Sequence, residues 1–107
     1  METSCGVILV NFDSVLILQY PRGHWDLPKG HVELADDDHL ATVRRELGEE
    51  TGITEIAFVE NFVERTAYTY RHKGKRMHKE VFWFLAETEQ LELPALTRAR
   101  SLRHERG

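Results

Sequence analysis

The 107-residue chain has one cysteine, three prolines and no long hydrophobic run. Because Cys5 has no partner within the chain, an internal disulfide is excluded, which is typical of proteins from a reducing compartment. The apolar run at residues 81–86 is far shorter than the about 20 residues that a membrane-spanning helix needs. No basic segment precedes the N-terminal apolar run, which disfavours a secretory signal peptide. We therefore expect a cytoplasmic protein that does not enter the membrane.

The composition is that of one folded domain. Hydrophobic residues make up 41% of the chain and charged residues 30%, a balance that favours a folded protein over a disordered one. This length allows one modest core, so we expect a single domain over residues 1–107. The net charge of −4 disfavours general nucleic-acid binding through phosphate contacts.

Apolar segments at the start of the chain predict strands. Residues 5–10 and 15–20 are rich in Val, Ile and Leu, and the turn-forming residues between them predict two strands joined by a tight turn. Residues 21–31 contain two prolines and two glycines and are expected to form a loop, or a short strand at residues 25–27.

The second half of the chain predicts a hairpin and a tail. Residues 66–70 and 77–87 have the pattern of two strands that turn near residues 73–74. The arginine-rich tail, residues 93–107, is expected either to form a short helix from Pro94 or to be disordered.

One amphipathic helix is predicted from about Asp38 to Thr51, because Leu40, Val43 and Leu47 recur at helical spacing on one face. A single good helix among several strands favours an α/β protein with a mixed sheet covered by helix.

The ends of this helix carry ordinary capping signals. Three consecutive aspartates, residues 36–38, can cap its N-terminus, and Gly52 is placed to end it. Gly48 lies inside the helix and costs about 1 kcal/mol relative to alanine, which predicts a close backbone approach there.

Three glutamates of the helix form a stripe beside its apolar face. Glu46, Glu49 and Glu50 are three and four residues apart, so their side chains converge. Like charges at this spacing repel, and a hard divalent cation such as Mg²⁺ would remove the repulsion. Arg45 precedes Glu49 by four residues and can orient its carboxylate. The alternative is a solvated helix face with salt-bridging arginines, and the helix alone does not decide between the two.

The residues around this stripe resemble the Nudix box. The box runs glycine, five residues, glutamate, seven residues, Arg-Glu-aliphatic, one residue, Glu-Glu, one residue and Gly-aliphatic. The matching positions are Gly30, Asp37, Arg45, Glu46, Leu47, Glu49, Glu50, Gly52 and Ile53. Asp37 stands in place of the first glutamate, and one extra residue separates it from Gly30. The resemblance implies a Nudix-type α/β/α sandwich with a mixed β-sheet and a shortened C-terminal part.

The resemblance also implies a metal-dependent hydrolysis of nucleoside polyphosphates. The metal would be bound by Gly30, through its carbonyl, and by Glu46, Glu49 and Glu50, with Mg²⁺ as the expected ion and Mn²⁺ as a substitute. The implied catalytic residues are Arg45, Glu46, Glu49 and Glu50. Water would attack one phosphorus, with Glu49 or Glu50 as general base.

Residues 25–33, WDLPKGHVE, are similar to the corresponding stretch of the asymmetrical diadenosine tetraphosphate hydrolases. This similarity implies cleavage of diadenosine tetraphosphate to ATP and AMP. The candidate substrate-binding residues are Lys29, His31, Tyr68, Tyr70 and Lys79, chosen because cations pair with phosphates and alternating strand tyrosines can stack on a purine. An ordinary loop histidine and packed tyrosines remain the simpler alternatives.

The turn of the predicted hairpin is basic as well. Lys73, Lys75 and Arg76, with Lys79, are expected either to hold distal phosphates or to form a solvated basic turn.

Three other functions remain open at this point. The chain could be a nucleoside triphosphate pyrophosphohydrolase, an enzyme that acts on RNA 5′ ends, or a non-catalytic module that binds nucleotides. A nucleotide is the expected partner, and nucleic acid is not expected except as such an RNA 5′ end. The shortened C-terminus would expose apolar surface, which favours a homodimer.

Overall fold

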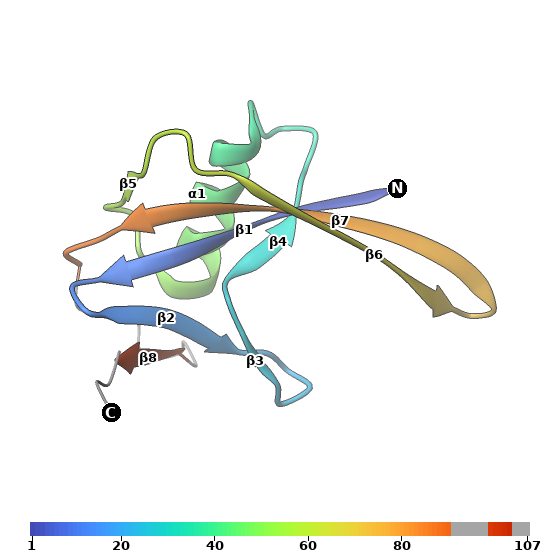
Figure 1. Cartoon of the computed structure of the whole chain (residues 1–107), viewed down its shortest axis with the longest axis horizontal. Helices are drawn as coiled ribbons and strands as arrows, with labels where there is room; N and C mark the ends of the chain where they lie inside the picture. Colours follow the sequence, from blue (N-terminus) through green and yellow to red (C-terminus); the bar gives the residue numbers. More distant parts are fainter. Residues whose placement is uncertain (91–98, 104–107) are drawn as a thin grey trace.

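A computed structural model of the chain describes residues 1–90 and 99–103 (Figure 1). The expected helix from Pro94 begins outside the described residues. The elements in chain order are β1 (Glu2–Asn11), β2 (Ser14–Gln19), β3 (Trp25–Asp26), β4 (Lys29–His31), α1 (His39–Thr51), β5 (Ala57–Phe58), β6 (Glu64–His72), β7 (Lys75–Glu87) and β8 (Ala99–Arg103).

All eight strands belong to one mixed sheet, which confirms the predicted class. The central order is β3-β2-β1-β7-β5, with β4 paired to β1, β6 to β7 and β8 to β2. Only β1 and β7 run parallel, and every other pair is antiparallel. The tight turn between β1 and β2 was predicted, and β3 agrees with the second of the two alternatives for residues 21–31, a loop or a short strand. The strand β8 lies within the tail, for which a helix or disorder was expected.

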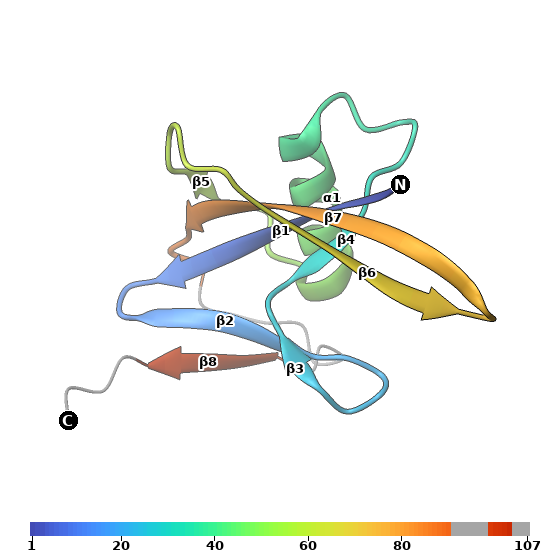
Figure 2. The same cartoon turned by 45° about the vertical axis from the view of Figure 1, so that its right-hand side comes forward.

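The helix α1 packs on one face of this sheet (Figure 2). Asp38 is its N-cap, since the carboxylate accepts a hydrogen bond from the Ala41 amide at 2.7 Å. Gly52 ends the helix with a φ of 76°, a left-handed conformation that suits glycine. Val43 and Leu47 are buried against the β1 core. Among the described residues α1 is the only helix, so the second helical layer of the expected sandwich is not seen in them.

The prediction of a close backbone approach at Gly48 is wrong. A Cβ atom at Gly48 would have no neighbour within 4 Å. The close approach of helix and strand lies instead at Gly30, described below.

The predicted hairpin is confirmed and is long. Lys73 and Gly74 have φ values of 51° and 77°, as in the two-residue turn that matches the twist of paired strands. The first contact of β7 with β1 pairs Glu2 with Lys79, so residues 75–78 pair with β6 alone. The end of the hairpin therefore projects from the body as a two-stranded ribbon (Figures 1 and 2).

In the part of the chain that the structure describes, no helix has the length and apolar character needed to cross a membrane.

Candidate active site

The acidic stripe of α1 lies directly against strand β4. A Cβ atom at Gly30 would overlap the carboxylate of Glu46, so only glycine allows the Glu46 side chain to keep this position. The Glu46 carboxylate therefore lies beside the β4 backbone at Gly30.

Arg45 ties the helix to the loop that precedes it. Its guanidinium donates to Glu46 Oε1 at 2.8 Å and to the carbonyl oxygen of His31 at 2.8 Å. It also reaches both oxygens of Asp36, at 3.0 and 3.1 Å, and Glu49 Oε2 at 3.4 Å. A planar fork of donors can satisfy all these acceptors, which a lysine could not do. Arg45 thus fixes Glu46 and the end of β4 together.

Asp36, and not Asp37, is the acidic partner of this arginine. The Asp36 side chain is 5% exposed and also accepts hydrogen bonds from Thr42 Oγ1 and the Glu33 amide, whereas Asp37 is exposed. The Arg45 guanidinium holds the pKa of the Asp36 carboxyl well below its usual range.

The position of Asp36 also changes how the sequence aligns with the Nudix box. Five residues separate Asp36 from Gly30, which is the spacing between the glycine and the first acidic residue of the box. The extra residue therefore lies after the acidic position, and the placement of Asp37 by counting back from the helix was wrong.

Glu50 lies in a half-buried position with Tyr20 beside it. The Tyr20 hydroxyl is 3.2 Å from Glu50 Oε2 and 3.2 Å from the Leu27 carbonyl oxygen, and it accepts the Lys29 amide at 3.2 Å. Burial, followed by the neighbouring Glu46 and Glu49 carboxylates, raises the pKa of Glu50 to about 7. Burial and the Glu50 charge also raise the pKa of Tyr20 above its usual range. Tyr20 thus connects α1 to the β3–β4 loop.

The carboxylates of α1 form a set of hard oxygen donors. Glu46 is 17% exposed and Glu49 is 61% exposed, so Glu49 has room to change rotamer. No three acidic, histidine or cysteine side chains already surround a common point among the described residues. The repulsion between Glu46 and Glu50 nevertheless favours a cation between them, and oxygen donors suit Mg²⁺ or Mn²⁺. The donor types present therefore fit a divalent ion.

The candidate substrate-binding residues lie on the other face of the sheet. Successive strand residues point to opposite faces, so Lys29 and His31 point away from α1 because Gly30 faces it. Lys79 pairs with Tyr68 in the β6–β7 register, and Tyr70 lies two residues further along β6. All five residues share one face, separated from the glutamates by the edge strand β4.

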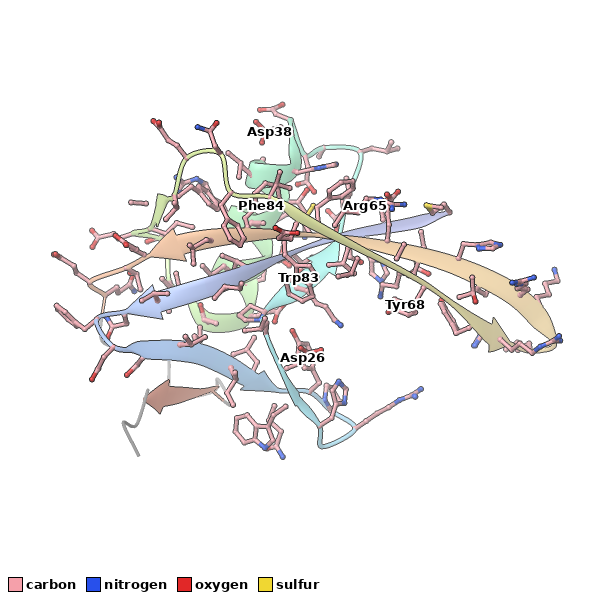
Figure 3. The ribbon with its side chains drawn as sticks, viewed as in Figure 1. Asp26, Asp38, Arg65, Tyr68, Trp83 and Phe84 are labelled. Carbon is pink, nitrogen blue, oxygen red and sulfur yellow. The ribbon has the colours of Figure 1, made fainter. Side chains whose placement is uncertain are left out.

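On this face Glu2 contacts two of the candidates, His31 and Tyr70. Its carboxylate lies 3.1 Å from His31 Nδ1 and 3.0 Å from the Tyr70 hydroxyl, which donates to it. The Tyr68 and Tyr70 rings are 6.1 Å apart, and Tyr68, labelled in Figure 3, is 47% exposed. Neither tyrosine belongs to the buried core, so stacking area is available.

Lys29 is oriented by two neighbours. Its ammonium is 3.1 Å from Asp26 Oδ2 and 6.0 Å from the centre of the Trp83 ring. Both residues are labelled in Figure 3. The charge of Lys29 therefore stays near β4, where it can meet a phosphate.

The tip of the hairpin lies apart from these residues. Val81 stands at the level of His31 in the sheet, because both are paired with Ser4. Lys75 is six residues further along β7, or about 20 Å at the usual strand rise of about 3.3 Å per residue. Lys73, Lys75 and Arg76 thus lie too far from β4 to hold phosphates bound by Lys29 and His31, so the register favours the alternative of a solvated basic turn.

Sequence reasoning missed Glu2, Tyr20 and Asp26. Glu2 and Tyr20 contact partners that are distant in the chain and lie in no recognisable motif, whereas Asp26 lies inside the WDLPKGHVE stretch and pairs with Lys29 three residues later. Asp36 was detectable, since the five-residue spacing from Gly30 identifies it.

The chain is similar to known proteins in sequence and in fold. The family profile described as NUDIX domain matches residues 2–103. The asymmetrical bis(5′-nucleosyl)-tetraphosphatase of Mus musculus is 40% identical over 78 residues, which cover 69% of this chain and 50% of that protein. An RNA pyrophosphohydrolase of Acidiphilium cryptum is 31% identical over 81 residues, covering 66% and 49%.

A crystal structure of the C. elegans Ap4A hydrolase resembles the whole described fold. The TM-score is 0.70 at 26% identity, with 96% of this chain and 80% of that chain covered. The chain spans about half the length of the curated relatives it matches.

Proposed function

Because the chain belongs to the NUDIX family, we propose that it hydrolyses a phosphoanhydride bond of a nucleoside polyphosphate, with diadenosine tetraphosphate as substrate and ATP and AMP as products. The observation that carries this proposal is the contact of Gly30 with Glu46, held by Arg45 and flanked by Glu50. The named tetraphosphatase relatives support the choice of substrate.

NUDIX hydrolases generally use divalent metal ions. We propose Mg²⁺ here, with Mn²⁺ as a substitute, held by Glu46, Glu49 and Glu50 and by the Gly30 carbonyl. When bound, the ion supplies charge neutralisation at the phosphates and an acidified water.

Arg45 and Glu50 would have separate roles in the reaction. Arg45 keeps Glu46 against β4, so this carboxylate does not have to be reoriented during the reaction. Between the two candidates for general base, Glu50 is favoured, because it is half-buried and contacts Tyr20, whereas Glu49 is exposed and contacts Arg45. A base with a fixed position transfers protons more effectively than a mobile one.

The substrate would cross the edge of the sheet at β4. Lys29 and His31 would contact phosphate oxygens, and Tyr68 and Tyr70 would stack on a purine on the face away from α1. Lys79, which pairs with Tyr68, would balance the charge of a phosphate near that base.

The test is hydrolysis of diadenosine tetraphosphate with Mg²⁺, with products separated by chromatography and Glu50→Gln as the inactive control. ATP and AMP that disappear in the control would support the substrate and the place of Glu50. Cleavage of nucleoside triphosphates or RNA 5′ ends instead would retain the site and replace the substrate, as the RNA pyrophosphohydrolase relative allows. Nucleotide binding without turnover of any of these would show a non-catalytic module.

A further inference from the structure

The positive charge of the chain is concentrated in the end of the β6–β7 hairpin. Residues 71–79, here called the basic arm, contain five lysines and arginines and no aspartate or glutamate. Since the whole chain has a net charge of −4, the rest carries −4 − 5 = −9. The overall acidity that disfavours nucleic-acid binding therefore does not describe this segment.

The register places like charges opposite one another in the arm. Arg71 pairs with Arg76, so these two cations share one face of the ribbon, and Lys75 lies on the other face opposite His72. Like charges directly opposite destabilise a hairpin. No ion pair joins the arm to an acidic side chain elsewhere in residues 1–90. Among the described residues, Glu2, which lies beside Lys79 in the sheet, is the nearest acidic partner by register, and the cations nearer the tip have none.

The arm is open on both faces. Residues 75–78 pair with β6 alone, and the ribbon extends beyond the start of β1, away from α1 (Figures 1 and 2). Because neighbouring residues alternate, Lys75 and Lys79 lie on one face and Arg76 on the other. A flat anionic membrane would meet only one of these faces, whereas a flexible polyanion can follow both.

Stacking surfaces lie at the base of the arm. Tyr68 and Tyr70 are on the face that carries Lys75 and Lys79. Alternating cations and aromatic rings are the arrangement with which proteins bind unpaired bases and the backbone between them. A base-paired duplex would not present its bases to these rings.

We propose that the basic arm binds single-stranded nucleic acid, with its phosphates along Arg71, Lys73, Lys75 and Arg76 and its bases over Tyr70 and Tyr68. A nucleotide that stacks on Tyr68 or Tyr70 ends at the base of the arm, and only a polymer continues along it to the tip. The proposal shares these two tyrosines with the proposed substrate site, so the test changes the arm cations, which lie outside the glutamate site.

The experiment is fluorescence anisotropy of a labelled single-stranded RNA of about 16 nucleotides, in EDTA so that metal-dependent cleavage is absent. The arm variant is Lys75→Glu/Arg76→Glu. Its second substitution places a carboxylate opposite Arg71, so the folded hairpin gains a favourable cross-strand pair while the arm loses cationic charge.

The matched control is Arg22→Glu/Arg44→Glu, which has the same net charge on the body of the protein. Arg22 and Arg44 are both exposed and lie outside the arm; Arg44 is on α1 and its guanidinium lies 5.0 Å from the centre of the Phe58 ring, a contact whose loss the melting curves would detect. We expect binding to weaken at least about tenfold in the arm variant and less than about twofold in the control. The slope of log affinity against log salt should fall by about 1.4, or about 0.7 for each lost phosphate contact.

Three results would overturn the proposal. They are no RNA binding by the unaltered protein at low salt, an equal loss in both variants, or stronger binding to duplex RNA or to anionic phosphatidylserine vesicles than to single strands. Melting curves of both variants check their folding. Hydrolysis of diadenosine tetraphosphate is measured separately and should survive in the arm variant, so failure of either proposal can be recognised without the other.

Discussion

The two charged regions of this molecule are built in opposite ways. In the glutamate site Arg45 contacts Glu46, Asp36 and the His31 carbonyl, so each charge has opposite charges or dipoles around it. In the basic arm, Arg71 faces Arg76 and both are exposed. The difference shows that the charged groups of the glutamate site are held in defined positions, because catalysis requires fixed distances between reacting groups. Charge in the arm is merely concentrated, which is sufficient to attract a polyanion.

The largest effect should come from filling the contact between strand and helix. Gly30→Ala places a methyl group where the Glu46 carboxylate lies, so one of them must move. We expect kcat/KM for diadenosine tetraphosphate to fall about 10²-fold, as for an ångström-scale misplacement, with weaker Mn²⁺ binding by electron paramagnetic resonance.

Gly48→Ala is the matched control for this change. The added methyl meets no atom within 4 Å, and it should stabilise the helix by about 1 kcal/mol. Equal activity losses in both alanine variants would show that the contact of Gly30 with Glu46 is not required.

The second largest effect is expected at Asp36, and it tests whether Asp36 or Asp37 holds the guanidinium of Arg45. Asp36→Asn removes the charge that holds the guanidinium, and metal affinity should fall about 10- to 100-fold, as for other residues that orient ligands. Asp37→Asn should change nothing, because Asp37 is exposed. An effect of Asp37→Asn as large as that of Asp36→Asn would restore the assignment made by counting.

Acid stability gives a second measurement on the same pair. The folded-state pKa of Asp36 is depressed, so its contribution to stability is present above the ordinary value of 3.8 and is lost as pH falls below it. Asp36→Asn should therefore flatten the decline of melting temperature below about pH 4, and Asp37→Asn should leave it unchanged.

A smaller effect is expected at Tyr20. Tyr20→Phe removes the hydroxyl that contacts Glu50 and the β3–β4 loop, and kcat should fall about three- to tenfold with little change in KM. Thr88→Val is the control, since it deletes a hydroxyl that bonds the Glu55 carbonyl away from the site. A change in KM alone, or the same loss in both variants, would assign Tyr20 a purely structural role.

The smallest effect is expected on stability, for a substitution in the basic arm. Arg71→Thr relieves the repulsion with Arg76 and should raise stability by about 0.2–1 kcal/mol in urea unfolding. Arg65→Thr on the same strand should lower stability, because Arg65 pairs with Glu80 at 2.9 Å. A loss of stability in Arg71→Thr would mean that the cations of the arm do not repel one another appreciably.

Local patterns predicted much of this fold. The helix was expected from Asp38 to Thr51 and runs from His39 to Thr51, because apolar spacing and the caps at Asp38 and Gly52 act within a few residues. The hairpin around residues 73–74 was predicted for the same reason, since a glycine with positive φ defines the turn.

Sequence patterns did not predict the contacts between segments that are far apart in the chain. Gly48 and Gly30 look equally unusual in the chain, but only Gly30 abuts a helix in space. The choice of Asp36 over Asp37 depends on which carboxylate reaches Arg45, and a count of residues cannot decide it.

The sequence by itself determined the α/β class, the family and the residue types of the site, since these depend on composition, spacing and the acidic stripe. Only the tertiary structure decided that Tyr20 contacts Glu50, that the substrate-binding candidates lie across β4 from the glutamates, and that the basic arm projects away from both. The physical reason is that hydrogen bonds, strand register and the exposure of a ribbon depend on which distant segments become neighbours when the chain folds.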